Sequence, residues 1–334
     1  MIKNKSTMDL SIVTTLYYSA PYLEEFYERA SRTAEELGLT FEIIFVNDGS
    51  PDDSALRVLE LRERDERVCL VDLSRNFGHH KAMMTGLSFA QGELVFLLDV
   101  DLEEAPELLS SFYTEMQSSG AEVVYGIREK REDKGMTRLF ATLYWKLFSW
   151  LSNVSIPGNQ LNARLMTKRY VSSLLNLRDK EVFMPGLWAL TGFKQVPVVA
   201  RKTSKGESTY TFRKRMAQMV DSVTSFSNKP LFLIFNLGII IALLSACAGC
   251  YLIIRRVFFD NLLEGWPSLM VAIWFLGGLT LFALGTIGIY LAKTYNEVKQ
   301  RPLTIVRSVH RGAARVEQQA VPASSLPKTK LTSG

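Results

Sequence analysis

The stretch Leu94-Val95-Phe96-Leu97-Leu98-Asp99-Val100-Asp101 decides the fold and indicates the chemistry. Its apolar residues predict a buried strand, and its two carboxylates stand where that strand gives way to a loop. Pro106, a few residues on, suits the first turn of a helix. Oxygen-only ligands favour Mg²⁺ or Mn²⁺ and leave coordination positions open for phosphates, so the motif predicts a divalent-cation site. The alternative is a solvated loop with helix-capping acids.

The first two hundred residues alternate between strand and helix signals. The predicted strands cover residues 10–16, 41–46, 68–73, 94–98 and 122–125, and the predicted helices cover residues 21–38, 53–65, 80–90 and 106–118. Such alternation predicts an α/β fold with a Rossmann-like, mostly parallel sheet that is covered on both faces. Ligands are then expected at the carboxyl ends of the strands.

Polar residues follow two more of these strands. Asp48, in Asn47-Asp48-Gly49-Ser50, could accept hydrogen bonds from a base or ribose, although a plain turn explains the same residues. The run from Asn76 to Lys81 places a helix N-terminus and a lysine where a phosphate could bind. The adjacent His79 and His80 are not expected to share a metal ion, because neighbouring helical side chains diverge by about 100°.

Two uncharged stretches, residues 231–254 and 266–292, lie in the last third of the chain. The first would form a helix of about 36 Å, which exceeds the roughly 30 Å of bilayer hydrocarbon. We therefore expect two transmembrane helices, with a pair of buried core helices as the alternative. Lysine and arginine flank both stretches on the side of the two termini, which predicts a cytoplasmic catalytic domain at an inner membrane.

The resulting domain prediction has six parts. They are a cytosolic catalytic domain (1–210), a juxtamembrane amphipathic helix (211–230), two transmembrane helices (231–254 and 266–292) joined by an external loop (255–265), and a cytosolic tail (293–334) disordered from about 312. No secretory signal opens the chain, and three scattered cysteines do not make a disulfide framework. The net charge of +5 lies mostly near the apolar stretches, which favours anionic membrane lipids over nucleic acid as partners.

Several motifs, in their order along the chain, resemble one family. They are Val46-Asn47-Asp48-Gly49-Ser50, Ser74-Arg75-Asn76-Phe77-Gly78, Asp99-Val100-Asp101-Leu102, Gly126-Ile127-Arg128, Gly206-Glu207-Ser208, Gly265-Trp266-Pro267 and Gln300-Arg301-Pro302. The chain resembles the membrane-associated, inverting glycosyltransferases of family 2 with a GT-A fold that charge polyprenyl phosphates. Dolichyl-phosphate mannose synthase and the bactoprenol glucosyltransferases typify that family.

The resemblance implies transfer of a sugar from a nucleotide sugar to undecaprenyl or another polyprenyl phosphate. UDP is the preferred nucleotide, with GDP and dTDP open. Mg²⁺ or Mn²⁺ would be held by Asp99 and Asp101. The nucleotide sugar would contact Tyr17, Asp48, Asn76, Gly78, Lys81 and Asp99, and the lipid phosphate would contact Arg128, Arg201, Lys202, Lys205 and Ser208.

The chain also departs from the family pattern. Thr14-Thr15-Leu16-Tyr17-Tyr18-Ser19 lacks the usual proline and Asn-Glu, which puts the base contacts in doubt. Glu103 replaces a common glutamine and could be a third metal ligand. An acid expected further on is an amide, Asn159 or Asn162 depending on how the motif is matched. Neither amide can act as a base, so we expect it to position a substrate, since a lipid phosphate is already ionised. The catalytic set implied is Asp99, Asp101, Asn159, Asn162 and Arg128.

Two other classes of protein remain open. A processive polysaccharide synthase is the enzymatic alternative, and a membrane scaffold that kept the fold without the chemistry is the other. The product of the leading hypothesis is a lipid-linked sugar donor for envelope glycans or glycolipids. The resemblance further implies a homo-oligomer, by analogy a tetramer, a flippase and a downstream glycosyltransferase.

Overall fold

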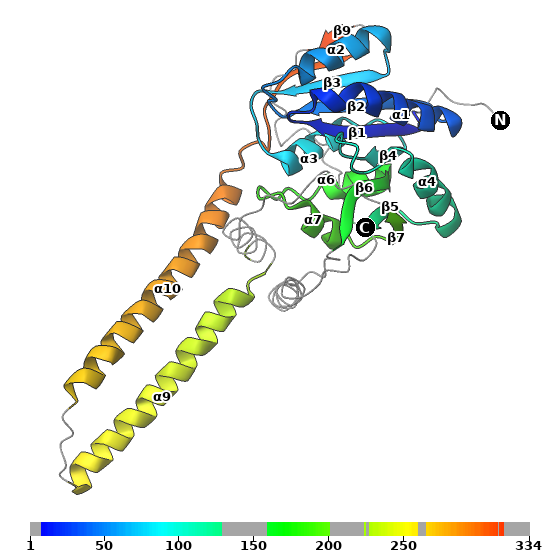
Figure 1. Cartoon of the computed structure of the whole chain (residues 1–334). Coiled ribbons are helices and arrows are strands. Elements are labelled where there is room, and N and C mark those ends of the chain that lie inside the picture. The colour runs from blue at the N-terminus through cyan, green and yellow to red at the C-terminus, as the bar shows by residue number, and fades with distance from the viewer. Residues whose placement is uncertain are drawn as a thin grey trace, which may run out of the picture. The chain divides into compact units, whose positions relative to one another are not determined.

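The computed structural model describes residues 8–128, 159–200, 224, 227–259, 265–312 and 314–316 (Figure 1). These residues divide into two compact units. The first unit holds the sheet with its helices and includes the described residues from Gln300 onward. The second unit holds two long helices.

The first unit is built on a nine-stranded sheet in the order β7-β5-β6-β4-β1-β2-β3-β8-β9. Seven of these nine strands run in one direction, and only β6 and β8 run against them. The prediction of a mostly parallel α/β sheet is therefore confirmed, and it is consistent with a GT-A fold. The strands are β1 (Leu10–Leu16), β2 (Phe41–Asn47), β3 (Val68–Leu73), β4 (Leu94–Leu97), β5 (Val123–Arg128), β6 (Gln160–Thr167), β7 (Gln195–Ala200), β8 (Val306–Arg311) and β9 (Ala314–Val316).

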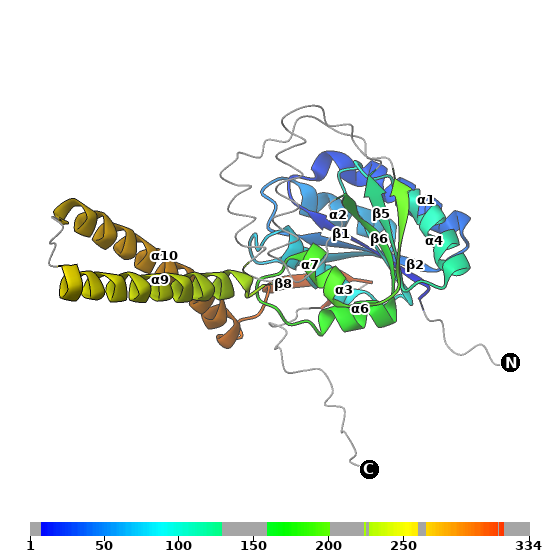
Figure 2. The same cartoon turned by 90° about the horizontal axis from the view of Figure 1, so that it is seen from below.

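Helices cover both faces of this sheet (Figure 2). One face carries α1 (Leu23–Glu36), α2 (Ser54–Arg64) and α4 (Leu108–Ser119), and the other carries α3 (His79–Phe89) and α6 (Lys168–Leu175). Every residue of β1 and β2 is buried, as expected of central strands covered on both faces. A short 3-10 helix, η1 (Ala20–Tyr22), precedes α1, and α7 (Met184–Leu190) follows α6.

The strand order reverses direction between β1 and β4. From β1 the chain moves outward through β2 to β3, and then crosses back to place β4 on the other side of β1. In open α/β sheets, ligands bind at the carboxyl ends of the strands beside such a reversal. The loops after β1 and β4, which carry Tyr17 and Asp99, both lie at this edge of the sheet, because the two strands are parallel neighbours.

The described C-terminal residues rejoin the sheet of the first unit. Residues 306–311, expected in a cytosolic tail, form β8 and pair antiparallel with β3. Arg307 stabilises this pairing, since its guanidinium lies 3.3 Å from Asp72 Oδ2 and donates to the Ser74 carbonyl at 2.8 Å. Without β8, the backbone N–H and C=O groups along the outer edge of β3 would lack hydrogen-bond partners, so the pairing stabilises both strands. Strand β9 likewise lies within the segment expected to be disordered from about 312, and residues 317–334 lie outside the described part.

The second unit contains α9 (Lys229–Phe259) and α10 (Trp266–Val298), which extend beyond both predicted apolar stretches. Within this unit Tyr290 donates from its hydroxyl to the Ser227 carbonyl at 2.6 Å. Among the described residues, one segment, Ala272–Val298, is long and apolar enough to cross a membrane, with a mean hydropathy of 1.9. In α9 the described residues give only a shorter apolar segment, Lys229–Ile241, so they support one span by this criterion where the sequence predicts two.

Candidate functional site

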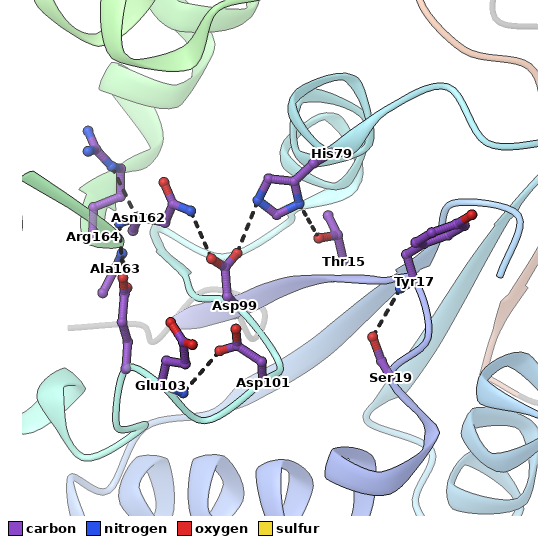
Figure 3. Close-up of polar contacts among 11 residues, drawn as sticks. Thr15, Tyr17, Ser19, His79, Asp99, Asp101, Glu103, Asn162, Ala163 and Arg164 are labelled. Carbon is purple, nitrogen blue, oxygen red and sulfur yellow. Dashed lines mark hydrogen bonds and ion pairs between the residues drawn. The ribbon is translucent and has the colours of Figure 1, made fainter. Parts of the chain in front are cut away.

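Two side chains from different elements contact the carboxylate of Asp99, and a third contacts one of them (Figure 3). Asn162, on β6, donates from its amide to Asp99 Oδ2 at 2.8 Å. His79, the first residue of α3, places Nε2 3.3 Å from Asp99 Oδ1. The other ring nitrogen of His79 lies 3.0 Å from the hydroxyl of Thr15, on β1. The carboxylate at the end of β4 is therefore held in one orientation by its neighbours.

The charge of His79 follows from this arrangement. Burial by itself lowers the pKa of the imidazole, because it disfavours the charged form. The contact with Asp99 and the nearby charges of Asp48 and Asp101 act in the opposite direction and prevail, so the pKa of His79 is raised above its usual value. The positive form of the ring is thus favoured beside the carboxylate.

The backbone of β6 at Asn162 is fixed from two sides. Glu104, which is 2% exposed, accepts hydrogen bonds from the backbone N–H of Asn162 at 3.3 Å and of Ala163 at 2.6 Å. Arg164 donates from Nε to the Asn162 carbonyl at 3.4 Å. The buried Glu104 and the buried Arg164 therefore fix the backbone from which the Asn162 side chain extends.

Arg164 is itself an unusual buried cation. Its side chain is completely buried, and the guanidinium carbon lies 3.0 Å from the centre of the Trp188 ring on α7. Burial lowers the pKa of this arginine to about 9, while the charge of Glu104 opposes that decrease. A cation of this kind is stabilised by the aromatic face and by the nearby acid.

The loop after β4 also carries the other predicted metal ligands. Leu102 has a φ of 60°, and this left-handed turn brings the Glu103 N–H back to Asp101 Oδ1 at 3.0 Å. The carboxylates of Asp99, Asp101 and Glu103 are hard oxygen donors of the type that Mg²⁺ and Mn²⁺ prefer. Within the described residues, however, no group of three His, Cys, Asp or Glu side chains converges closely enough to hold an ion. The three-carboxylate site stays a prediction, and the donor chemistry fits a metal completed by a substrate phosphate.

The loop after β2 is joined to the loop after β3 through Asp48. Its carboxylate is almost fully buried and accepts the N–H groups of Phe77 at 2.7 Å and Gly78 at 3.0 Å. Burial raises the pKa of Asp48, and these two hydrogen bonds oppose the increase. Asp48 thus has a structural role in positioning the helix N-terminus of α3, beside the base or ribose contact predicted for it.

Gly49 shows how closely these two loops approach. Its φ is +63°, and a Cβ at this position would lie 2.5 Å from the backbone nitrogen of Asn76. Only glycine satisfies both conditions. Asn76 and Gly78 therefore lie against the loop that carries Asp48, and Lys81 lies in the first turn of α3.

The two candidate amides occupy different places. Asn162 contacts Asp99, whereas the side chain of Asn159 donates to the Arg128 carbonyl at 3.1 Å and the backbone carbonyl of Asn159 accepts the Arg128 N–H at 2.8 Å. Asn159 and Arg128 therefore pair with each other at the end of β5. The predicted phosphate ligands Arg201, Lys202, Lys205 and Ser208 lie outside the described residues, as does most of the predicted juxtamembrane helix.

Sequence reasoning did not assign His79, Glu104 or Arg164 to the site. A signal existed for β6, since Gln160-Leu161-Asn162-Ala163-Arg164-Leu165 alternates polar and apolar residues as a strand does. That alternation places Asn162 and Arg164 on one face. No comparable local signal existed for His79 or Glu104, because their partners lie on other elements.

The chain belongs to the glycosyl transferase family 2, whose model matches residues 11–177. It is 46% identical to a protein of Mycobacterium tuberculosis named among putative glycosyltransferases, over 98% of this chain and 96% of that one. It is 32% identical to the SfII prophage-derived bactoprenol glucosyl transferase of Shigella flexneri, over 91% of this chain and 99% of that one. The chain is accordingly a glycosyltransferase, related to the bactoprenol glucosyl transferases.

A solved structure with a similar arrangement is the mannosyltransferase PcManGT of Pyrobaculum calidifontis, in complex with GDP-Man and Mn²⁺. It is 16% identical over 88% of this chain and 87% of its own, with a TM-score of 0.46.

Proposed function

We propose that this glycosyltransferase moves a sugar from a nucleotide sugar, with UDP preferred, to a polyprenyl phosphate and inverts the anomeric configuration. One observation carries the proposal most directly, namely the carboxylate of Asp99 held by Asn162 and His79 at the carboxyl ends of the strands. The relatives named bactoprenol glucosyl transferase add support for a polyprenyl acceptor. The product is a lipid-linked sugar donor for envelope glycans or glycolipids.

The side chains of the loop after β4 would bind the diphosphate end of the donor. Asp99 and Asp101, with Glu103 as a third donor, would hold Mg²⁺ or Mn²⁺. A bound divalent ion stabilises negative charge as it develops on the leaving nucleoside diphosphate. Asn162 keeps one oxygen of Asp99 directed toward β6 while His79 faces the other oxygen. The base and ribose of the donor would contact the loops that carry Tyr17 and Asp48.

The acceptor needs positioning more than deprotonation. A phosphate monoester has its second pKa near 6, so its oxygen is ionised at neutral pH and can attack the anomeric carbon directly. An amide at Asn162 is sufficient for that task, because it orients without removing a proton. Arg128, together with Arg201, Lys202, Lys205 and Ser208, would bind the lipid phosphate through charge-assisted hydrogen bonds.

The second unit would hold the enzyme at an inner membrane. We propose that α9 and α10 both cross the bilayer, with the catalytic unit and both termini in the cytoplasm, as the flanking lysines and arginines favour. The apolar segment Ala272–Val298 supports one of these spans. We further propose that the enzyme forms a homo-oligomer. Its lipid product would then need a flippase and a downstream glycosyltransferase.

The test uses the full chain in detergent with undecaprenyl phosphate and a panel of UDP-, GDP- and dTDP-sugars. Release of nucleoside diphosphate is followed with Mn²⁺ or with EDTA, and the Asp101→Asn variant serves as a control. We expect release that requires both metal and lipid and that occurs with one donor. Folded protein that binds UDP or GDP without metal dependence and releases nothing would contradict the proposal and favour a scaffold.

A further inference from the structure

Strand β8 has a β-bulge at Arg307. Its neighbours Val306 and Ser308 pair with two successive residues of β3, so Arg307 is one residue too many for a regular ladder. Bulges of this kind redirect a side chain, and they are frequent beside active sites. This bulge lies at the carboxyl end of β3, directly before the loop that leads to α3.

The guanidinium of Arg307 lies at the start of that loop. Its Nη2 donates to the Ser74 carbonyl at 2.8 Å, and the Ser74 N–H donates to the Ile305 carbonyl at 2.9 Å. Both backbone polar groups of Ser74 are therefore bonded to the segment that returns from the C-terminal part of the chain. Ser74 is the residue from which the loop carrying Asn76 and Gly78 departs.

A second chain of contacts runs from the same guanidinium to the loop after β2. Arg307 Nη1 donates to Asp72 Oδ2 at 3.3 Å, and Asp72 Oδ1 accepts the side-chain amide of Asn47 at 2.7 Å. The oxygen of that amide accepts the Ser50 N–H at 3.0 Å. Three hydrogen bonds in sequence thus connect β8 to the turn that carries Asp48.

The charge of Asp72 gives this chain its direction. The carboxylate is 13% exposed, so it needs donors in place of the water that it has lost. An ionised carboxylate only accepts hydrogen bonds, so it selects the orientation of the buried Asn47 amide in which the oxygen faces Ser50. Arg307 supplies the cation that makes an ionised Asp72 acceptable at this position.

The other end of β8 provides a contrast, because a similar arginine holds it. Arg311 lies 3.0 Å from Glu42 Oε2 and donates to the Phe89 carbonyl at 2.7 Å. Glu42 lies at the start of β2 and Phe89 at the end of α3, so these contacts are at the edge of the sheet away from the candidate site. The side chain of Arg311 is 26% exposed and that of Arg307 is 61% exposed. The stability of β8 should therefore depend on Arg311 at least as much as on Arg307.

We propose that Arg307 is a positioning residue for the donor nucleotide. It acts through Asp72 and Ser74, which fix how the loops after β2 and β3 lie against each other. The inference rests on the proposed function, in which the loop after β2 contacts the base and ribose of a nucleoside diphosphate. It adds to that function a residue outside the part of the chain that the family model matches.

The first experiment measures the affinity of the full chain for UDP with Mn²⁺ by calorimetry. It compares the unaltered chain with Arg307→Gln and with Arg311→Gln, which make the same chemical change at the two ends of one strand. We expect Arg307→Gln to bind UDP about 5-fold more weakly, as when a partly exposed ion pair is lost. Arg311→Gln should bind within about twofold of the unaltered chain, although its Tm falls by as much or more.

Two results would overturn the proposal while leaving the proposed function intact. One is an unchanged affinity for UDP in Arg307→Gln. The other is an equal loss in Arg311→Gln, which would mean that affinity only follows the stability of β8. Failure of the unaltered chain to bind UDP, GDP or dTDP would overturn both the proposal and the proposed function.

Kinetics separate positioning of the donor from a general effect on the enzyme. In Arg307→Gln the KM for the nucleotide sugar should rise about 5-fold, while kcat and the KM for the lipid phosphate stay within about twofold. A fall in kcat with an unchanged KM for the nucleotide sugar would contradict a role in donor binding. Hydrogen exchange reports on the loops themselves, and residues 47–50 and 74–78 should exchange several-fold faster in Arg307→Gln but not in Arg311→Gln.

The route through Asp72 is tested by a double variant. Asp72→Asn removes the partner of Arg307 while it keeps an oxygen for the amide of Asn47, and we expect it to weaken UDP binding about 5-fold. Combined with Arg307→Gln, the loss should stay near 5-fold, since both changes remove the same interaction. A loss of about 25-fold in the double variant, as expected for independent effects, would show that Arg307 does not act through Asp72.

Discussion

The two halves of the candidate site are held in different ways. The first half consists of the loops after β1 and β2. There, side-chain oxygens of Ser50, Asp52 and Ser54 accept hydrogen bonds from backbone N–H groups, and the rings of Tyr17 and Tyr18 stay exposed. In the second half, the loop after β4 with β6, the contacts are made to the functional side chain itself, since Asn162 and His79 both face Asp99. Fixing a backbone suits the recognition of a ligand's shape, whereas fixing a carboxylate suits the placement of charge.

The largest effect should come from removing the charge at the centre of the second half. Asp99→Asn keeps the size of the side chain but removes the negative charge that would hold the metal. We expect turnover to fall about 10³-fold, as when a transition-state stabiliser is lost. The measurement is release of nucleoside diphosphate with lipid acceptor and Mn²⁺. An unchanged Tm would show that the fold is kept, and turnover within fivefold of the unaltered chain would remove Asp99 from the proposed chemistry.

The next effect tests the close contact between the loop after β2 and the loop after β3. Gly49→Ala introduces a methyl group that would lie 2.5 Å from the Asn76 nitrogen, on a residue with a φ of +63°. We expect a loss of about 3 kcal/mol of unfolding free energy, from strain and backbone overlap together. Gly38→Ala is the matched control, because Gly38 has a φ of +67° but nothing within 4 Å. It should cost only about 1 kcal/mol, and equal losses in chemical denaturation would mean that the two loops can separate freely.

A smaller effect is expected at Asn162, one of the two amides that could stand in place of the family's acid. Asn162→Ala removes the donor to Asp99 and should lower kcat about 10-fold, because the carboxylate loses one of the groups that orient it. Asn162→Asp restores an acid beside Asp99, and we expect it to raise kcat by less than about 10-fold. Asn159→Ala serves as the comparison, since Asn159 pairs with Arg128 instead. A gain of several orders of magnitude in Asn162→Asp, with unchanged metal affinity, would refute the positioning role.

The smallest effect concerns the acid that organises the first half. Burial by itself would raise the pKa of Asp52, but hydrogen bonds from Ser50, Ser54 and the Ala20 N–H outweigh it and lower the pKa to about 2. A depressed pKa in the folded state stabilises the fold above the unfolded value near 3.9, and this contribution is lost as the pH falls toward 2.

Asp52→Asn should therefore cost about 1 kcal/mol at pH 6 and almost nothing at pH 2, after allowance for solvent screening. Thermal unfolding of the two chains between pH 6 and pH 2 measures the difference. A gap between the two chains that stays constant over this range would mean that the ionised carboxylate is not what stabilises the loop.

Much of the first unit could be predicted from the sequence. The five predicted strands fall within one or two residues of β1 to β4 and at the start of β5, because buried apolar runs bounded by turn residues are a local signal. β6 was missed although its residues alternate, since its polar positions were interpreted only as site residues. β8 was missed because the six residues from Val306 carry two arginines and a histidine, and only pairing with β3 makes them a strand.

The sequence alone therefore determined the α/β alternation, the position of Asp99 and Asp101 at the end of a strand, and the two long apolar helices. These features depend on the order of apolar and polar residues over short distances, which the chain carries wherever it folds. Only the tertiary structure decided that Asn162 and not Asn159 contacts Asp99, that His79 faces the same carboxylate, and that β8 returns to the sheet. Those contacts join residues far apart in the chain, and they exist only because the order of strands in the sheet brings their ends together.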